Sequence, residues 1–180
     1  MKTYLSLKVP LRANARWLGE LRSRMRGLPV NWAPGDFHLT LARLNERPDG
    51  LSDQEMTRII NWHLAEAQAP EIVFNQIDVF TNPVSGRHII ALIGTDGLPA
   101  AFGDLTRALR ADLADRGCTL DAPFRPHVTL GRMPAKAMPL SELQAIGAAV
   151  NMPRFTLQPR EALYRIAPRL STIGHWTLRK

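Results

Sequence analysis

A six-residue pattern occurs twice in this chain, once in each half. Residues 38–43 read HLTLAR and residues 127–132 read HVTLGR, so four of the six positions are identical. Each copy follows a predicted helix and a loop, and each alternates as a β-strand does. A repeat of this kind indicates a duplicated half-domain with pseudo-two-fold symmetry. The two copies are therefore expected at equivalent places in the fold.

The spacing inside the repeat predicts which side chains point the same way. Residues i and i+2 of a strand lie on one face of a sheet, so the His and the Thr of each copy share a face and the apolar residues share the other. If the two strands face each other across a cleft, His38, Thr40, His127 and Thr129 converge on it.

The rest of the chain alternates between strand and helix patterns. Strands are expected over residues 3–9, 37–44, 71–80, 87–93, 126–130, 155–158, 162–166 and 176–178, and helices over residues 11–27, 52–69, 98–116 and 140–150. Ser52 with Glu55 three residues later predicts a capping box. Local hairpins together with helical crossovers predict an α+β fold with helices on the outer faces of the sheets. The length of 180 residues fits one domain, residues 1–180, with two lobes.

Composition excludes several classes of protein. With 45% hydrophobic residues the chain has enough apolar material to fold, so disorder over its whole length is excluded. Its longest apolar runs fall short of the roughly 20 residues that a membrane span needs, and no stretch of signal-peptide type precedes Lys8. We therefore expect a cytoplasmic protein that does not bind a membrane. A single cysteine, Cys118, excludes a disulfide framework and a multi-cysteine metal site.

The charge of the chain is strongly positive. Its 23 Lys and Arg residues oppose 16 Asp and Glu residues, which gives a net charge of +7, and only four of the 23 are lysines. Arginine grips phosphate with a planar fork, so this balance favours a phosphate-bearing partner such as RNA. A high-GC genome that favours arginine codons explains the composition equally well.

Two imidazoles beside two hydroxyls suit the chemistry of phosphodiesters. The pKa of histidine is about 6.5, so at neutral pH one ring can be neutral and take a proton while the other is protonated and gives one. The threonine hydroxyls can donate hydrogen bonds to the phosphate oxygens, where negative charge grows in the transition state. Such a site needs neither a metal nor a cofactor.

Both motifs resemble the paired H-x-T-x motifs of the two-histidine (2H) phosphoesterase superfamily. Residues 31–37 (NWAPGDF) and 124–132 (FRPHVTLGR) further resemble its RNA 2′,3′-cyclic phosphodiesterase branch, also known as bacterial and archaeal 2′–5′ RNA ligases. The resemblance implies a bilobal fold of two antiparallel sheets in a V with helices outside. It also implies metal-independent opening of a terminal 2′,3′-cyclic phosphate to a 2′-phosphate.

Carried onto this chain, the resemblance makes His38 and His127 the catalytic pair, with Thr40 and Thr129 holding the phosphate. We assign His127 as the general base toward water and His38 as the general acid toward the 3′ oxygen. The motif is symmetric, so its sequence alone leaves this order open.

Four further residues lie close to the motifs. Arg125 shares strand parity with His127, and Arg132 reaches the same face if the chain turns at Gly131; both are candidate phosphate contacts. Tyr4 matches a position where the family carries an aromatic residue that could stack on a base, and packing within the sheet is the equal alternative. Arg43 holds the position of Arg132 in the first motif, and we expect it to be a surface charge.

Three alternatives remain beside hydrolysis. The same groove could join a cyclic end to a 5′-hydroxyl as a 2′–5′ RNA ligase, could bind RNA without catalysis, or could open a small cyclic nucleotide. The expected partner is RNA with a 2′,3′-cyclic phosphate end, tRNA fragments among them, and the expected state is a monomer.

Overall fold

A computed structural model describes residues 2–121, 123–167 and 171–180. The strands are β1 (Thr3–Lys8), β2 (Asn31–Trp32), β3 (His38–Glu46), β4 (Ile72–Phe74), β5 (Gln76–Asn82), β6 (Arg87–Ile93), β7 (Thr119–Leu120), β8 (Val128–Pro134), β9 (Phe155–Leu157), β10 (Glu161–Ile166) and β11 (Ser171–Thr177). The helices are α1 (Arg16–Arg24), α2 (Asp53–Leu64), α3 (Ala100–Asp115) and α4 (Leu140–Ala148), with a 3-10 turn η1 (Ala135–Ala137). None of the described helices is long and apolar enough to cross a membrane.

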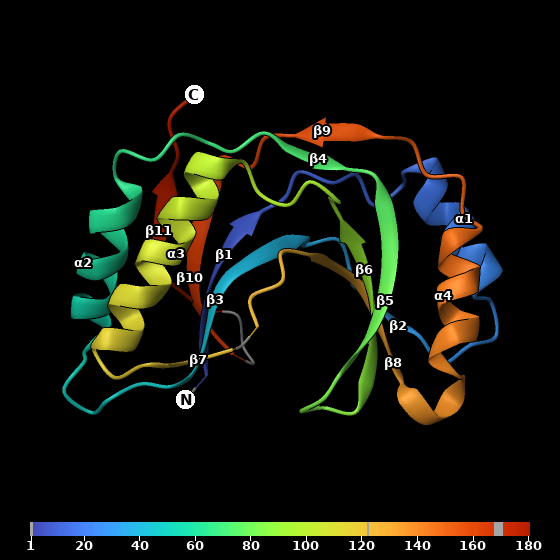
Figure 1. Ribbon diagram of the computed structural model, residues 1–180, viewed down its shortest axis with the longest axis horizontal. Coiled ribbons are helices and arrows are strands. Elements are labelled where there is room, and N and C mark those ends of the chain that lie inside the picture. The colour runs from blue at the N-terminus through green and yellow to red at the C-terminus, as the bar shows by residue number, and fades with distance from the viewer. Residues whose placement is uncertain (1, 122, 168–170) are drawn as a thin grey trace.

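The main sheet is antiparallel and bends into an arch (Figure 1). Its strand order is β11-β10-β1-β3-β8-β6-β5, with β2 added beside β8 and β7 beside β3. The first lobe contains β3 with β1, β10 and β11; the second contains β8 with β6 and β5. Their only registered contact among the described residues is Leu39 opposite Val128, which we call the joining pair. The arrangement confirms the predicted fold class.

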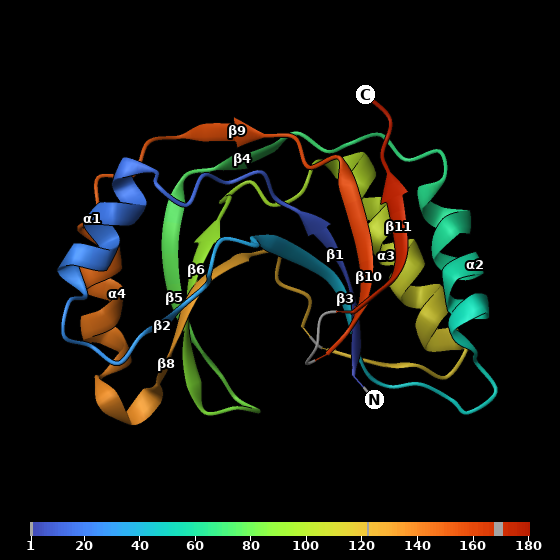
Figure 2. The same cartoon turned by 180° about the vertical axis from the view of Figure 1, so that it is seen from behind.

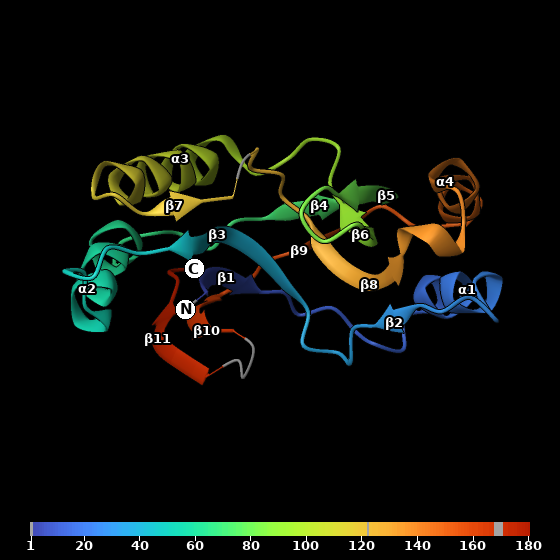
Figure 3. The same cartoon turned by 90° about the horizontal axis from the view of Figure 1, so that it is seen from below.

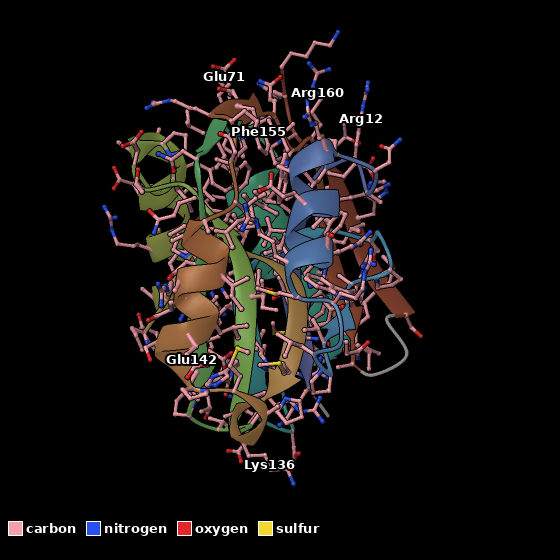
Figure 4. The ribbon with its side chains drawn as sticks, turned by 90° about the vertical axis from the view of Figure 1, so that its right-hand side faces the viewer. Arg12, Glu71, Lys136, Glu142, Phe155 and Arg160 are labelled. Atoms are coloured by element: carbon pink, nitrogen blue, oxygen red, sulfur yellow. The ribbon has the colours of Figure 1, made fainter. Side chains whose placement is uncertain are left out.

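Helices cover the outer side of each lobe, as predicted. Figure 2 shows α2 and α3 outside the first lobe and α1 with α4 outside the second. The short sheet of β4 and β9 closes the top of the arch, where Phe155 packs on Trp17 of α1 with ring centroids 6.1 Å apart and on Phe74 at 5.9 Å. Phe155 lies at that end in Figure 4, where α1 and α4 run side by side. The sheet face turned away from the helices is called the inner face below.

Local sequence signals set several element boundaries. The predicted capping box is confirmed, because Ser52 Oγ accepts the Glu55 N–H at 3.2 Å and Glu55 Oε2 accepts the Ser52 N–H at 2.8 Å. The strand expected over residues 71–80 is two strands in different sheets. Asn75 separates them, since its side chain bonds both the hydroxyl and the N–H of Thr95, at 2.8 Å and 3.0 Å. The strands β2 and β7 have two residues each, too few to produce a periodic pattern.

Both motif strands contain a β-bulge at the same place in the repeat. In β3 the register with β1 shifts after Thr40 and leaves Leu41 as the additional residue. In β8 the register with β6 shifts after Thr129 and leaves Leu130 as the additional residue. A bulge reverses the alternation of side chains beyond it. The arginine that ends each motif therefore points to the same inner face as the threonine.

Each bulge has a carbonyl group that its own ladder does not use, and each is satisfied differently. Arg110 of α3 donates from Nη1 to the Leu41 carbonyl at 3.0 Å, and it also bonds the carbonyl of Asp121. The Leu130 carbonyl accepts the N–H of Ala33 at 2.8 Å. Both bulges are thus hydrogen-bonded to segments outside the sheet ladder, which fixes their geometry.

Gly131 is required by close packing at the second bulge. An added Cβ would lie 2.8 Å from Val30 Cγ1 and 3.1 Å from Trp32 Cε3. Its backbone is outside the left-handed region that favours glycine. The bulge at Leu130, rather than a turn at Gly131, therefore carries Arg132 to the inner face. The equivalent residue of the first motif, Ala42, is also small and buried.

We expect Gly131→Ala to lower the free energy of unfolding by about 1–3 kcal/mol, the usual cost of overpacking. Gly19→Ala in α1 is the matched control. Nothing lies within 4 Å of its added Cβ, so this substitution should raise the free energy of unfolding by about 0.5–1 kcal/mol. Urea denaturation of both variants measures the difference. Equal stabilities for Gly131→Ala and the unaltered protein would contradict the packing argument.

Candidate active site

The joining pair brings the two motifs to one place on the inner face. Neighbours alternate along antiparallel strands, so His38 and Thr129 flank the pair on one side, and Thr40 and His127 flank it on the other. All four side chains are half-buried. Figure 3 shows β3 and β8 diverging on either side of this point. The structure therefore brings together the four residues that the repeat predicted to converge.

Both imidazoles are held through the same ring atom. The Nδ1–H of His38 donates to the backbone carbonyl of Asp36 at 3.2 Å, and the Nδ1–H of His127 donates to the carbonyl of Arg125 at 2.8 Å. A carbonyl oxygen only accepts, so Nδ1 carries a proton in both rings. Nε2 is then the atom of each ring that can take or give a proton.

An aromatic side chain packs against each imidazole. Tyr4 stacks on His38 with ring centroids 5.6 Å apart, and the edge of one ring meets the face of the other between Phe80 and His127 at 5.2 Å. Tyr4 is only 9% exposed, which leaves little ring surface for a base. Its contact with His38 instead fits the packing alternative, in which Tyr4 sets the orientation of the imidazole.

An ion pair braces the segment before each motif, and the two pairs have opposite polarity. In the first lobe the residue before the motif is the negative partner: the Asp36 carboxylate accepts a hydrogen bond from Nη1 of Arg165 in β10 at 2.6 Å. In the second lobe the residue before the motif is the positive partner: the Arg125 guanidinium donates a hydrogen bond to the carboxylate of Asp78 in β5. The Arg125 guanidinium also lies over the ring of Phe80, 4.4 Å from its centroid. The carbonyl that orients each histidine thus belongs to a residue fixed by its own side chain.

These surroundings lower the pKa of both imidazoles below the usual value for histidine. Burial, which disfavours the charged form, is the main cause in each ring, and the bond to the carbonyl opposes it. The neighbouring charges differ, because the Asp36 carboxylate raises the pKa of His38, with Arg165 opposing it by a smaller effect, whereas Arg125 lowers the pKa of His127. Arg132 lowers the pKa of both rings, so its guanidinium lies within electrostatic range of each.

The bulges place two arginines differently from what simple alternation predicts. Arg132 is on the inner face, as expected for a candidate phosphate contact. Arg43 is exposed, as expected for a surface charge, and the bulge at Leu41 brings it to the inner face as well, opposite Tyr4 in the β1–β3 register. Its Nε lies 3.8 Å from an Asp121 oxygen, an ionic contact longer than a hydrogen bond.

Sequence reasoning missed four residues that surround the imidazoles: Asp36, Asp78, Phe80 and Arg165. The two ion pairs join positions 129 and 47 residues apart, and no local pattern signals such pairing. Strand alternation over β5 gives a partial signal, since Asp78 and Phe80 share a parity. Within the described residues, no three His, Cys, Asp or Glu side chains lie together as a metal site would require.

Comparisons with known proteins show which family the chain belongs to. The sequence matches the 2'-5' RNA ligase superfamily over residues 10–163. None of the curated proteins compared matches the chain. Among solved structures, Usb1 of Kluyveromyces marxianus has a TM-score of 0.68 at 16% identity, covering 98% of each chain. TT0787 of Thermus thermophilus has a TM-score of 0.63 at 20% identity, covering 99% of this chain and 98% of that one.

Escherichia coli LigT in complex with 3'-AMP is also similar, with a TM-score of 0.56, 20% identity, and coverage of 99% of this chain and 98% of LigT. Identities at this level show a shared fold. The family match spans most of the chain, including both motifs. The chain therefore belongs to the 2'-5' RNA ligase superfamily, a group of 2H phosphoesterases.

Proposed function

We propose that this protein hydrolyses the 2′,3′-cyclic phosphate at the end of an RNA strand to a 2′-phosphate, without a metal. The observation that carries the proposal is the joining pair, which sets two histidines and two threonines side by side on the inner face. RNA as the substrate class rests on the family. The net charge of +7 supports a polyanionic partner.

The opposite polarity of the two ion pairs supports an order for acid and base. The Asp36 carboxylate favours the protonated form of His38, and the charge of Arg125 favours the neutral form of His127. His127 Nε2 then takes a proton from water as its oxygen bonds to phosphorus. His38 Nε2 gives a proton to the 3′ oxygen as the bond from phosphorus to that oxygen breaks. The product carries a 2′-phosphate and a free 3′-hydroxyl, and solvent restores both rings.

The remaining inner-face groups fit supporting roles. Thr40 and Thr129 flank the joining pair and donate hydrogen bonds to the non-bridging oxygens of the phosphate. Arg132 lies beyond Thr129 on the same strand, and its positive charge acts on both imidazoles from there. Arg125 is held by Asp78 and Phe80, so its first role is to fix the carbonyl that orients His127. Tyr4 orients His38 in the same way from its buried position.

The same groups serve ligation when a 5′-hydroxyl replaces water as the nucleophile. Proton transfer by His127 and His38 is then unchanged, and the product is a 2′–5′ linkage. Water is always present at high concentration, whereas a second RNA end must be captured, so hydrolysis is the primary reaction in this proposal.

Purified protein should convert an oligoribonucleotide with a 2′,3′-cyclic phosphate end to the 2′-phosphate in the presence of EDTA. His38→Ala and His127→Ala should each lower turnover by about 10²–10⁴, the usual contribution of one acid or base. His63→Gln is the matched control, since His63 bonds Asp112 between α2 and α3 on the outer side. Mass spectrometry of the product distinguishes hydrolysis from ligation. An RNA that binds but stays intact would sink the hydrolase proposal and favour a binding protein.

The dependence of kcat/KM on pH should be bell-shaped, with both limbs below pH ~6.5. Both limbs are expected on the acid side of this value because burial lowers the pKa of both imidazoles in the free protein. A bound phosphate adds negative charge beside the rings and raises their pKa, so the bell for kcat should lie at higher pH. Initial rates between pH 4.5 and 8.5 test this. A kcat/KM that keeps rising above neutral pH would refute it.

A substrate with sulfur at the 3′ bridging position tests the order of acid and base. A thiolate leaves without needing a proton, because the pKa of a thiol is only about 8.5. His38→Ala should therefore regain most of its lost rate on the sulfur substrate, whereas His127→Ala should stay slow because attack by water still needs the base. Recovery of the His127 variant alone would reverse the assignment.

A further inference from the structure

Three arginines of the inner face take no part in the proposed proton transfers. Arg43 lies on β3, Arg87 begins β6 and Arg132 lies on β8. Arg132 is opposite Ile89, two residues after Arg87, so Arg87 and Arg132 are diagonal neighbours on the same face. All three side chains are exposed. Two strands of the second lobe and one of the first thus contribute positive charge to the same side of the sheet.

The strands that hold the arginines lie on both sides of the arch. β3 and β8 run down opposite sides of it, with β6 beside β8 (Figure 1). Arg43 and Arg132 each lie three residues past a motif threonine, and one of the intervening residues is taken up by the bulge. Each is therefore about two strand steps, or ~7 Å, beyond the threonine of its own motif, and about four steps beyond the histidine of that motif. Partial burial and then the charges of Arg43 and Arg87 lower the pKa of Arg132, so both of those guanidiniums lie within electrostatic range of Arg132.

Carboxylates neutralise this group only in part. Asp36 and Asp78 are already paired with arginines that brace the motifs. Asp121 approaches Arg43 at 3.8 Å through one oxygen, and its other oxygen accepts a bond from Asn45 at 2.8 Å. Within the described residues, no carboxylate lies within 4.0 Å of the other two guanidiniums. Like charges at this spacing repel, and an anionic ligand would relieve that repulsion.

We propose that Arg43, Arg87 and Arg132 form a second phosphate site, separate from the place where the cyclic phosphate reacts. Its ligand is a phosphate on the 5′ side of the terminal nucleoside, about one nucleotide away. Guanidinium forks bind phosphate oxygens in pairs, so three of them suit a dianion or a backbone diester. This site rests on the proposed function, because the reacting cyclic phosphate fixes the distance to the second phosphate.

The test compares two substrates in one ratio. Cytidine 2′,3′-cyclic phosphate has no second phosphate, whereas a dinucleotide with a 2′,3′-cyclic end has one. The ratio of their kcat/KM values should favour the dinucleotide and fall about tenfold or more in R43Q/R87Q. R107Q is the matched control, since Arg107 is exposed on α3 and paired with Asp104, and it should leave the ratio unchanged. An unchanged ratio in R43Q/R87Q would overturn the site.

Binding without turnover separates this proposal from the proposed reaction. Calorimetry with a dinucleotide that carries a 2′-phosphate end measures the site even in a protein that hydrolyses nothing. Kd should rise about tenfold in R43Q/R87Q, and the slope of log Kd against log salt should become shallower. Equal Kd and equal slope in variant and unaltered protein would overturn the site. Absence of turnover with this loss of binding would instead overturn only the hydrolase proposal.

A third substrate identifies which phosphate is bound. Cytidine 2′,3′-cyclic phosphate with a 5′-phosphate carries a terminal dianion in place of a diester. If its kcat/KM matches that of the dinucleotide, the site accepts any 5′ phosphate. If only the dinucleotide has a higher kcat/KM than cytidine 2′,3′-cyclic phosphate, the site binds the backbone diester of an RNA strand. In both outcomes the gain must be lost in R43Q/R87Q, and a gain that survives the substitutions contradicts the proposal.

Discussion

One apolar cross-strand pair, Leu39 against Val128, decides where everything else in this site lies. The ladders within each lobe are long, whereas β3 and β8 share this pair and then diverge. Both side chains are buried, so their packing stabilises the contact from the helix-covered side. The residues on either side of the pair must then turn to the inner face. A small hydrophobic contact between lobes therefore gathers two imidazoles and two hydroxyls on one face of the sheet.

The repeat preserves backbone geometry more closely than it preserves the contacts that support it. A bulge follows the threonine in each copy, and each time it leaves a carbonyl that needs a donor. Arg110 supplies that donor in the first lobe, and the N–H of Ala33 supplies it in the second. The residue after the bulged leucine is small in both copies: it is Ala42 in the first and Gly131 in the second. The shared requirement is an arginine turned to the same face as His and Thr, and each half meets it with different neighbours.

The parts of this fold that could be predicted are those governed by local patterns. Alternation around each motif gave the shared face of His and Thr, and the Ser52–Glu55 pair marked the start of α2. Strand parity alone does not place Arg43 or Arg132 on the inner face, because a bulge cannot be recognised from alternating residues. It also could not divide β4 from β5, since Asn75 interrupts them through a bond to Thr95, in the turn that follows β6. The ion pairs that brace the histidines depend on the order of strands in the sheet, which local patterns do not specify.

Those ion pairs explain how a symmetric motif can perform two different tasks. His38 and His127 have the same rotamer-fixing bond from Nδ1 to the carbonyl two residues earlier, and burial acts on both. Nothing within the motifs distinguishes an acid from a base. The distinction comes from side chains outside them, because the brace of the first motif has its carboxylate beside the imidazole and the brace of the second has its guanidinium there. On the proposed mechanism, the two halves of the duplication are differentiated by the direction of a salt bridge, so the roles of the two histidines can diverge while the motif itself stays unchanged.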